Sequence, residues 1–270
     1  MDLNMAMTKL KQTCKGGASL VRLMASRPTA VFKPVRYLFL ISHMRSRSSL
    51  LSHVLGSHPE ITGYFESHIA YRHKLDFVLL RHRVMESLDG APLGRYVLDK
   101  VLHRWYITPQ LMNRMGARAV FLLRDPESSL KSLVASNFFN APTPAATLKR
   151  ATVYYFKQLK WIQKCCGELK TRGIFIESES LVNQTQRNFE LLQERLELGS
   201  PLSESYQMFN DTGRAEYGDP SQLILAGQIV RDGRTSYSEA PQIPESTVIE
   251  ARYAYDQCAQ ALRETCWHLD

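Results

Sequence analysis

Short apolar runs of the kind found in buried strands alternate along this chain with longer segments whose apolar residues recur at helical spacing. The runs predict strands at 36–41, near 61–65, and at 95–99, 118–123 and 173–177. The helical spacing predicts helices at 48–57, 67–88, 108–115, 126–136, about 145–171, 184–196 and about 245–267. Strands that alternate with helices favour a three-layer α/β fold, with a central, mostly parallel sheet covered by helices on both faces. Ligands of such folds bind at the carboxyl ends of the strands.

The turn between the first strand and the first helix carries the clearest functional signal. A helix N-terminus exposes unpaired backbone N–H groups and the positive end of the helix dipole, so it attracts anions. In this turn Ser46, Ser48 and Ser49 add hydroxyl donors, and Arg45 and Arg47 add positive charge. We therefore expect the turn to bind phosphate. An ordinary serine-capped helix with two solvated arginines is the alternative.

The turn differs from the phosphate-binding loop of nucleoside triphosphatases. That loop has the pattern G-x-x-x-x-G-K-[ST], in which the lysine contacts the β- and γ-phosphates and the hydroxyl binds magnesium. No such pattern occurs in this sequence. A strand, turn and helix that bind phosphate without these groups indicate a donor other than ATP, or a different transferable group.

A second anion-binding feature is predicted where the strand at 118–123 ends. Arg124 terminates this strand, and Asp125 followed by Pro126 is typical of a helix start, with Asp125 as the cap. Ser132 lies about two turns into that helix. At this spacing the side chains of Arg124 and Ser132 can converge on one anion above the edge of the sheet.

These two motifs, the turn at Arg45 and a later Arg-Asp-Pro with a serine eight positions after the arginine, resemble those of the sulfotransferase family. The resemblance implies a P-loop-like nucleotide-binding fold. It also implies the donor 3′-phosphoadenosine 5′-phosphosulfate (PAPS), the product 3′,5′-adenosine bisphosphate (PAP), and no metal. By this resemblance the 5′-phosphosulfate is bound by Arg45, Ser46, Arg47, Ser48, Ser49 and Leu50, and the 3′-phosphate by Arg124 and Ser132. Arg47 stands where the family usually has glycine, which leaves the loop conformation open.

Three other segments match the family in the same order along the chain. Residues 96–100, which end in Asp-Lys and precede His103, are similar to its strand after the first helical region. Residues 174–181 are similar to a later strand that leads into Glu-x-Leu. Residues 227–234, with Arg231 and Arg234, loosely resemble the loop that closes over the 3′-phosphate end of the nucleotide. With these segments the resemblance covers about residues 36–269.

The resemblance also assigns residues to the chemistry. Sulfonate transfer needs an acceptor in line with the sulfur, charge stabilisation on the leaving 5′-phosphate, and a base for the acceptor proton. Arg45 would stabilise the leaving group. Glu66 matches a position where bacterial and Golgi-type relatives have a carboxylate and is our preferred base; His68, His103 or a purely structural Glu66 are the alternatives. We expect Lys100 in the sulfonate or acceptor pocket, the alternative being an exposed lysine at a strand end.

Composition narrows the class of protein and its partners. The 270 residues are 44% hydrophobic and 22% charged, which fits one large domain, here 36–270. The net charge of +8 suits an anionic nucleotide and would suit an anionic acceptor. No nucleic-acid-binding module is recognisable, so we expect no nucleic-acid partner. The five cysteines are odd in number and lack metal-ligand spacing, which favours a reducing cytoplasm over a disulfide framework or a zinc site.

Two segments have more than one interpretation. Residues 1–35 form a basic leader with an amphipathic pattern and without the apolar core of a signal peptide. The leader could provide peripheral membrane contact, an edge of the acceptor site, or a surface extension packed on the domain. Residues 200–247 are irregular and rich in proline and glycine, and we expect a mobile lid over the nucleotide, with a static loop as the alternative. The apolar runs of the chain are too short to cross a bilayer.

The acceptor and the reaction also keep alternatives. A hydroxyl or amine on a glycan, a lipid or a small alcohol fits the sequence equally well, because acceptor pockets in this family come from variable loops. Two other functions are compatible with the motifs. One is a non-catalytic protein that binds nucleotides or polyanions, and the other is a kinase-like transferase that uses ATP.

Overall fold

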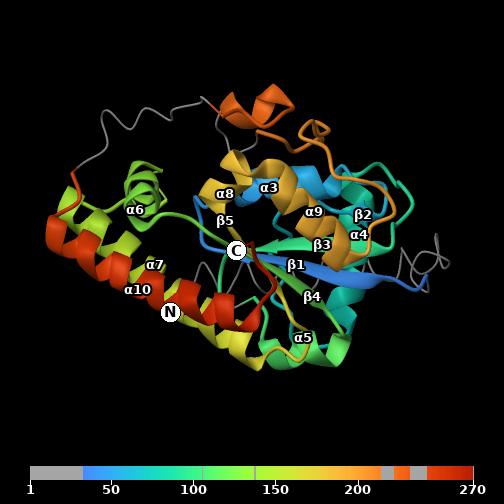
Figure 1. Ribbon diagram of the computed structural model, residues 1–270, viewed down its shortest axis with the longest axis horizontal. Helices are drawn as coiled ribbons and strands as arrows, with labels where there is room; N and C mark the ends of the chain where they lie inside the picture. The colour runs from blue at the N-terminus through green and yellow to red at the C-terminus, as the bar shows by residue number, and fades with distance from the viewer. Residues whose placement is uncertain (1–32, 105, 137, 214–221, 232–241, 270) are drawn as a thin grey trace.

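In the residues that the structure describes, five parallel strands form one sheet in the order β2-β3-β1-β4-β5 (Figure 1). The computed structural model describes residues 33–104, 106–136, 138–213, 222–231 and 242–269. The strands are β1 (Arg36–Ser42), β2 (Ile61–Thr62), β3 (Tyr96–Val101), β4 (Arg118–Leu123) and β5 (Ile174–Glu177). Leu38 of β1 lies opposite Leu98 of β3 and Arg118 of β4, so β1 is the central strand.

Helices cover both faces of this sheet. One face is covered by α3 (Ser48–Gly56), α8 (Ser178–Asn183) and α9 (Thr185–Leu196). The other is covered by α4 (Leu75–Ser87), α5 (Pro109–Met115), α6 (Pro126–Ala135), α7 (Pro144–Glu168) and α10 (Glu245–Thr265). The long helices α7 and α10 run side by side (Figure 1), and a short 3-10 helix, η1, spans Gln222–Ala226. The three-layer α/β fold predicted from the sequence is confirmed.

The central strand is buried on both faces. Leu38, Phe39, Leu40 and Ile41 are all 0% exposed. Phe39 and Ile41 pack in the apolar cluster under α4 and α7, whereas Leu38 and Leu40 pack in the cluster under α3 and α9. Burial on both sides explains why this strand is a continuous apolar run and not an alternating one. Each such side chain contributes about 1.5–3 kcal/mol to folding.

The helices that follow β1 and β4 leave the sheet toward opposite faces. α3 follows β1 onto one face and α6 follows the neighbouring β4 onto the other. This reversal is the topological switch point at which open α/β sheets bind their ligands. It brings the loop after β1 beside α6, since the Nε of Arg45 donates to the Oγ of Ser132 at 2.8 Å.

Observed and predicted elements differ most between residues 61 and 88. The strand predicted near 61–65 ends at Thr62, because Gly63 has a φ of 118° and a Cβ there would lie 2.3 Å from the carbonyl oxygen of Leu98. The helix predicted at 67–88 begins only at Leu75. The carboxylate of Asp76 accepts the backbone N–H groups of Arg72 and His73, at 2.6 and 3.0 Å, and so holds the chain in a turn just before the helix.

The described parts of segment 200–247 pack against the domain. Tyr206, Ile224 and Ile229 are buried in the apolar cluster under α3 and α9. Ser205 and Gln228 form an isolated antiparallel bridge. Closure of this segment as a lid stays a prediction. The predicted leader lies, up to residue 32, outside the described residues. Among the helices that the structure describes, none has the length and apolar character needed to span a membrane.

Candidate active site

The loop between β1 and α3 holds two arginines in the left-handed conformation. Arg45 and Arg47 both have a φ of 65°. Arg47 is the N-cap residue of α3, where its side chain makes no capping hydrogen bond, and the first turn of the helix contains no acidic residue. The helix N-terminus therefore keeps its capacity to bind an anion. Arg47, at the position where the sulfotransferases that the sequence resembles usually have glycine, thus has a backbone conformation that glycine favours.

Three of the predicted anion-binding residues meet at this loop. Besides the bond from Arg45 to Ser132, the Nη1 of Arg124 donates to the carbonyl oxygen of Arg45 at 2.8 Å. Arg124 is 8% exposed and Ser132 1%. The Nε of Arg124 is buried and makes no hydrogen bond with any described residue. Since a buried charged donor without an acceptor is costly, this N–H fits a site for an anionic ligand.

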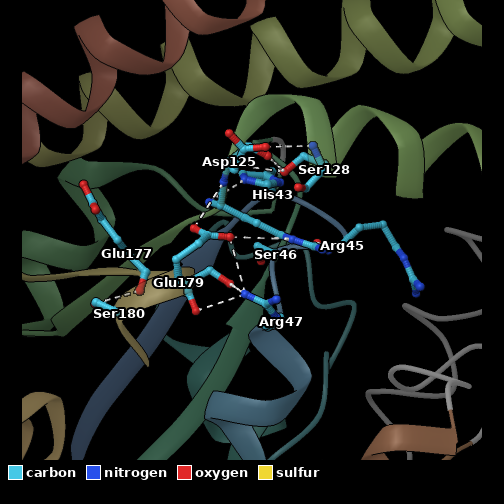
Figure 2. Close-up of polar contacts among 12 residues, drawn as sticks. His43, Arg45, Ser46, Arg47, Asp125, Ser128, Glu177, Glu179 and Ser180 are labelled. Atoms are coloured by element: carbon cyan, nitrogen blue, oxygen red, sulfur yellow. Dashed lines mark hydrogen bonds and ion pairs between the residues drawn. The ribbon is translucent and has the colours of Figure 1, made fainter. Parts of the chain in front are cut away.

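Glu179 on α8 was missed by the sequence reasoning, and it lies between two of these arginines. Its Oε1 is 3.4 Å from the Nη1 of Arg47 and 4.0 Å from the Nε of Arg124. Arg47 also donates to the carbonyl and hydroxyl oxygens of Ser178, both at 3.2 Å. Figure 2 shows Glu179 beside Arg47, with the side chain of Arg45 directed away from them. In this geometry Arg47 therefore joins the loop to α8.

The predicted serines and Lys100 lie around the first turn of α3. Ser46, Ser48 and Ser49 are buried, and the Ser46 hydroxyl is 2.6 Å from that of Ser42. The Nζ of Lys100, at the end of β3, donates to the Oγ of Ser49 at 3.1 Å. Lys100 is only 2% exposed, so the alternative of an exposed lysine is wrong. Burial of an ammonium group requires compensating acceptors or anions, which suits a site for a negatively charged group.

Leu50, the last residue assigned to this loop, has a different environment. Its side chain is partly buried and packs against the apolar cluster under α3 and α9. Its backbone belongs to the first turn of the helix. Any contact of Leu50 with an anion would therefore come from the backbone N–H.

Glu66 lies near Lys100, in the segment that follows β2 along the end of β3. Its side chain is buried, and Oε1 has no hydrogen-bond partner among the described residues. This oxygen is 3.7 Å from the Nδ1 of His68 and 3.9 Å from the Nε2 of His103. Burial raises the pKa of Glu66, and the nearby charges of His68 and Lys100 oppose that rise. A carboxylate with a raised pKa, and with an oxygen that makes no hydrogen bond to the described residues, is suited to accept a proton.

The two histidines beside Glu66 differ in their surroundings. His103 is 6% exposed, and burial lowers its pKa to about 4, so the ring is neutral at neutral pH. It is stacked against the exposed Phe138 with ring centroids 6.1 Å apart. His68 is more exposed, has a φ of 53°, and its Nδ1 is 3.1 Å from the hydroxyl of Tyr106. The structure thus brings Glu66, His68, His103 and Lys100 into one cluster.

Two further buried groups support the site. The Nε2 of His43 accepts the backbone N–H of Arg124 at 3.3 Å. Asp99, beside Lys100, accepts from the N–H and hydroxyl of Ser67 at 2.8 and 2.6 Å and from the hydroxyl of Tyr71 at 2.5 Å. These bonds fix the strand ends that carry Arg124 and Lys100.

Tyr154 and Gln158 on α7 join the end of β1 to the end of β3 and were also missed. The Tyr154 hydroxyl accepts the N–H of Met44 at 2.9 Å and donates to the carbonyl of Leu102 at 2.7 Å. The Nε2 of Gln158 donates to the carbonyl of Ser42 at 2.8 Å. No local signal marks these residues, because their partners lie more than 50 positions away in the sequence.

Arg231 lies on the side of the sheet covered by α9. It donates to Glu204 at 2.6 Å and to the hydroxyl of Thr185 at 3.3 Å. Arg234, the second arginine assigned to the nucleotide loop, falls outside the described residues. Within the described residues, no group of three or more His, Cys, Asp or Glu side chains is placed to hold a metal ion.

The loop after β1 thus lies at the switch point of a doubly wound parallel sheet, beside the N-terminus of α3 and the side chain of Arg124. No protein-family model matches this sequence, and no curated protein matches it either. Among solved structures, the sulfotransferase domain from the curacin biosynthetic pathway is similar, with a TM-score of 0.59 and 17% identity, over 83% of this chain and 98% of that chain.

A mouse sulfotransferase, SULT7A1 complexed with PAP, is similar with a TM-score of 0.53 and 12% identity. That similarity covers 85% of this chain and 89% of the mouse chain. The chain therefore has the sulfotransferase fold.

Proposed function

We propose that this protein is a sulfotransferase that transfers a sulfonate group from PAPS to a hydroxyl or amine of its acceptor, without a metal. The observation that carries the proposal is the cluster of Arg45, Arg124 and Ser132 beside the N-terminus of α3. Within it, the buried Nε of Arg124 lacks a hydrogen-bond acceptor among the described residues. The similar mouse sulfotransferase is complexed with PAP, which supports a nucleotide of this kind.

The residues present fit a nucleotide with phosphate groups at both the 3′ and the 5′ position. We assign Arg124 and Ser132 to the 3′-phosphate. We assign the first turn of α3 and the guanidinium of Arg45 to the 5′-phosphosulfate, together with the hydroxyls of Ser46, Ser48 and Ser49. Leu50 contributes its backbone N–H. Arg47 holds the loop against α8. Arg231 and Arg234 would approach the 3′-phosphate end when segment 200–247 closes.

The proposed chemistry uses few groups of the chain. The bound nucleotide supplies the transferable sulfonate. Arg45, the α3 N–H groups and the ammonium of Lys100 stabilise negative charge where the leaving phosphate forms, in a buried site where such charges act strongly. Glu66 accepts the proton of the acceptor hydroxyl through Oε1, which has no hydrogen-bond partner among the described residues. His68 and His103 are the alternative bases, because the Nδ1 of His68 and the Nε2 of His103 each lie within 4 Å of that oxygen.

The first experiment titrates the purified chain with PAP, 5′-AMP and ATP by calorimetry. We expect PAP to bind in the micromolar range and the other two much more weakly, because they lack the 3′-phosphate. Arg124→Ala should weaken PAP binding about 10- to 100-fold, as expected for lost charge-assisted hydrogen bonds. Arg114→Ala, an exposed site on α5, removes the same charge and should leave binding unchanged.

The outcomes separate the alternatives. Equal or absent binding of all three nucleotides would refute the proposal. A preference for ATP would favour the kinase-like transferase. Tight PAP binding without any transfer would favour the non-catalytic binding protein.

The second experiment tests the base by measuring sulfonate transfer to a panel of hydroxylated acceptors. Glu66→Gln should lower turnover about 10²- to 10⁴-fold while PAP binding is retained. The wild-type rate should fall as the pH drops through the raised pKa of Glu66, because the protonated carboxyl cannot accept a proton. If His68→Gln or His103→Gln abolished this fall of the rate at low pH, while Glu66→Gln left turnover unchanged, the general base would be that histidine.

We also propose that residues 36–270 form a single sulfotransferase domain and that residues 1–35 are a basic extension. A cytoplasmic location, with peripheral membrane contact through the extension, completes the proposal. The thiols of Cys165, Cys166, Cys258 and Cys266 are free, which is consistent with a reducing compartment.

A further inference from the structure

A pocket lies between α7 and the loops that follow β3 and α6. Its volume is about 440 Å³, within the range of small-molecule sites. Phe139, Val153 and the ring of Tyr154 provide apolar wall. Gln158 provides a polar group that is already bonded to Ser42 and to the N–H of Arg104. A hydrocarbon or aromatic body therefore fits the interior.

The remaining lining is positively charged. Arg104, Lys149, Arg150 and Lys157 all line the pocket, and no carboxylate does. Lys149, Arg150 and Lys157 form no ion pair with a described acidic residue. Arg150 instead donates to the carbonyl of Asn140 at 2.8 Å, which places its charge at the rim. Four cations around an apolar interior match a ligand with an apolar body and a negative group.

The pocket adjoins the cluster around Glu66. Tyr154, which forms part of its wall, packs edge-on against His103 with ring centroids 5.7 Å apart. His103 in turn lies next to Glu66, whose Oε1 is 3.9 Å from the Nε2 of the ring. Phe139 packs against Tyr154 at 5.2 Å between centroids. Tyr154 and His103 thus connect the wall of the pocket to the proposed base.

We infer that this pocket binds the acceptor, and that the acceptor is a small amphipathic molecule with an anionic group, such as a hydroxyaryl carboxylate. The inference rests on the proposed function because it takes the pocket as the acceptor site. The anionic group lies between Lys149, Lys157 and Arg104, the apolar body lies against Phe139 and Val153, and the hydroxyl is directed toward Glu66. A neutral alcohol or an uncharged glycan would give Lys149 and Lys157 no negative partner.

The test measures binding of para-hydroxyphenylacetate and a hydroxynaphthoate, each beside its methyl ester, by ligand-observed NMR with and without PAP. The acid and the ester differ only in the charge, so the ester should bind about tenfold more weakly if two cations contact the carboxylate. Lys149→Gln combined with Lys157→Gln should weaken binding of the acids by a similar factor and leave the esters unchanged. The control is Lys160→Gln with Lys164→Gln, two exposed lysines on the same helix outside the pocket.

Each outcome decides the inference. Equal binding of acid and ester, equal losses in the two double variants, or no binding of either acid would overturn it. If PAP binds and the acids do not, the inference fails and the proposed function stands. If the acids bind with the expected variant pattern and PAP does not, the donor assignment fails and the pocket remains an anion site.

Discussion

The left-handed conformation of Arg47 gives a prediction that can be tested without any ligand. An L-residue in this region costs about 1–2 kcal/mol, and glycine avoids that cost. Glycine also gains about 0.4–1 kcal/mol of entropy in the unfolded chain, which offsets part of the relief. Arg47→Gly and Arg47→Ala both lose the contacts with Ser178 and Glu179. We therefore expect the glycine variant to be more stable than the alanine variant by about 0.5–1 kcal/mol.

The assay is urea denaturation of both variants, with thermal melts as a second measure. A difference of this size corresponds to about 1–4 °C in Tm for a domain of this length. The matched control is the same pair at Glu190, an exposed residue within α9. There alanine should be the more stable variant by about 0.5–1 kcal/mol, because residue 190 has a helical backbone and alanine has a higher helix propensity than glycine. The reasoning is refuted if alanine is as stable as glycine at position 47.

Three other predictions concern groups around the site. Burial lowers the pKa of His43 from 6.5 to about 4. Between these pH values the unfolded state binds more protons than the folded state, so the free energy of unfolding falls by up to about 3 kcal/mol as the pH drops from 6.5 to 4. His43→Gln should flatten that part of a urea-stability profile, and an unchanged slope would contradict this. Glu179→Gln removes a negative charge facing Arg47 and Arg124 and should tighten PAP binding about 5- to 10-fold by calorimetry; equal affinity would place the phosphate elsewhere. Tyr154→Phe leaves the Met44 N–H and Leu102 carbonyl without their partner and should cost about 2 kcal/mol, whereas Tyr253→Phe, exposed on α10, should have no effect on Tm.

Much of the fold could be predicted from the sequence because its central strands have an unmistakable pattern. β1 and β4 are apolar runs buried on both faces, and Asp125 followed by Pro126 starts α6 as expected. The start of α4 could not be predicted in the same way. It depends on the Asp76 side chain accepting two backbone N–H groups, and the apolar residues before it fit a helix equally well.

The candidate site was only partly predictable. The proximity of the Arg45 turn to the motif of Arg124 and Ser132 follows from their positions at neighbouring strand ends. The direct bond from Arg45 to Ser132 was not predicted, because the sequence assigned these residues to different phosphates. The burial of Lys100 does not follow, since lysines at strand ends are usually exposed. Glu179 and Tyr154 could not be found either. Their contacts with Arg124 and Met44 join segments that are far apart in the sequence, and only the folded chain brings them together.

The helix α7 presents two adjacent rows of side chains with different partners. Residues 150, 154 and 158 form one row, through which Tyr154 and Gln158 hold the backbone at Met44 and Ser42. Residues 149, 153 and 157 form the next row; both rows line the pocket, but the second is not bonded to the backbone of the loop after β1. Substitutions along the second row can change what the pocket accepts without loosening the first. The specificity of the pocket can thus change through one row of α7, while the other row keeps the loop after β1 in place.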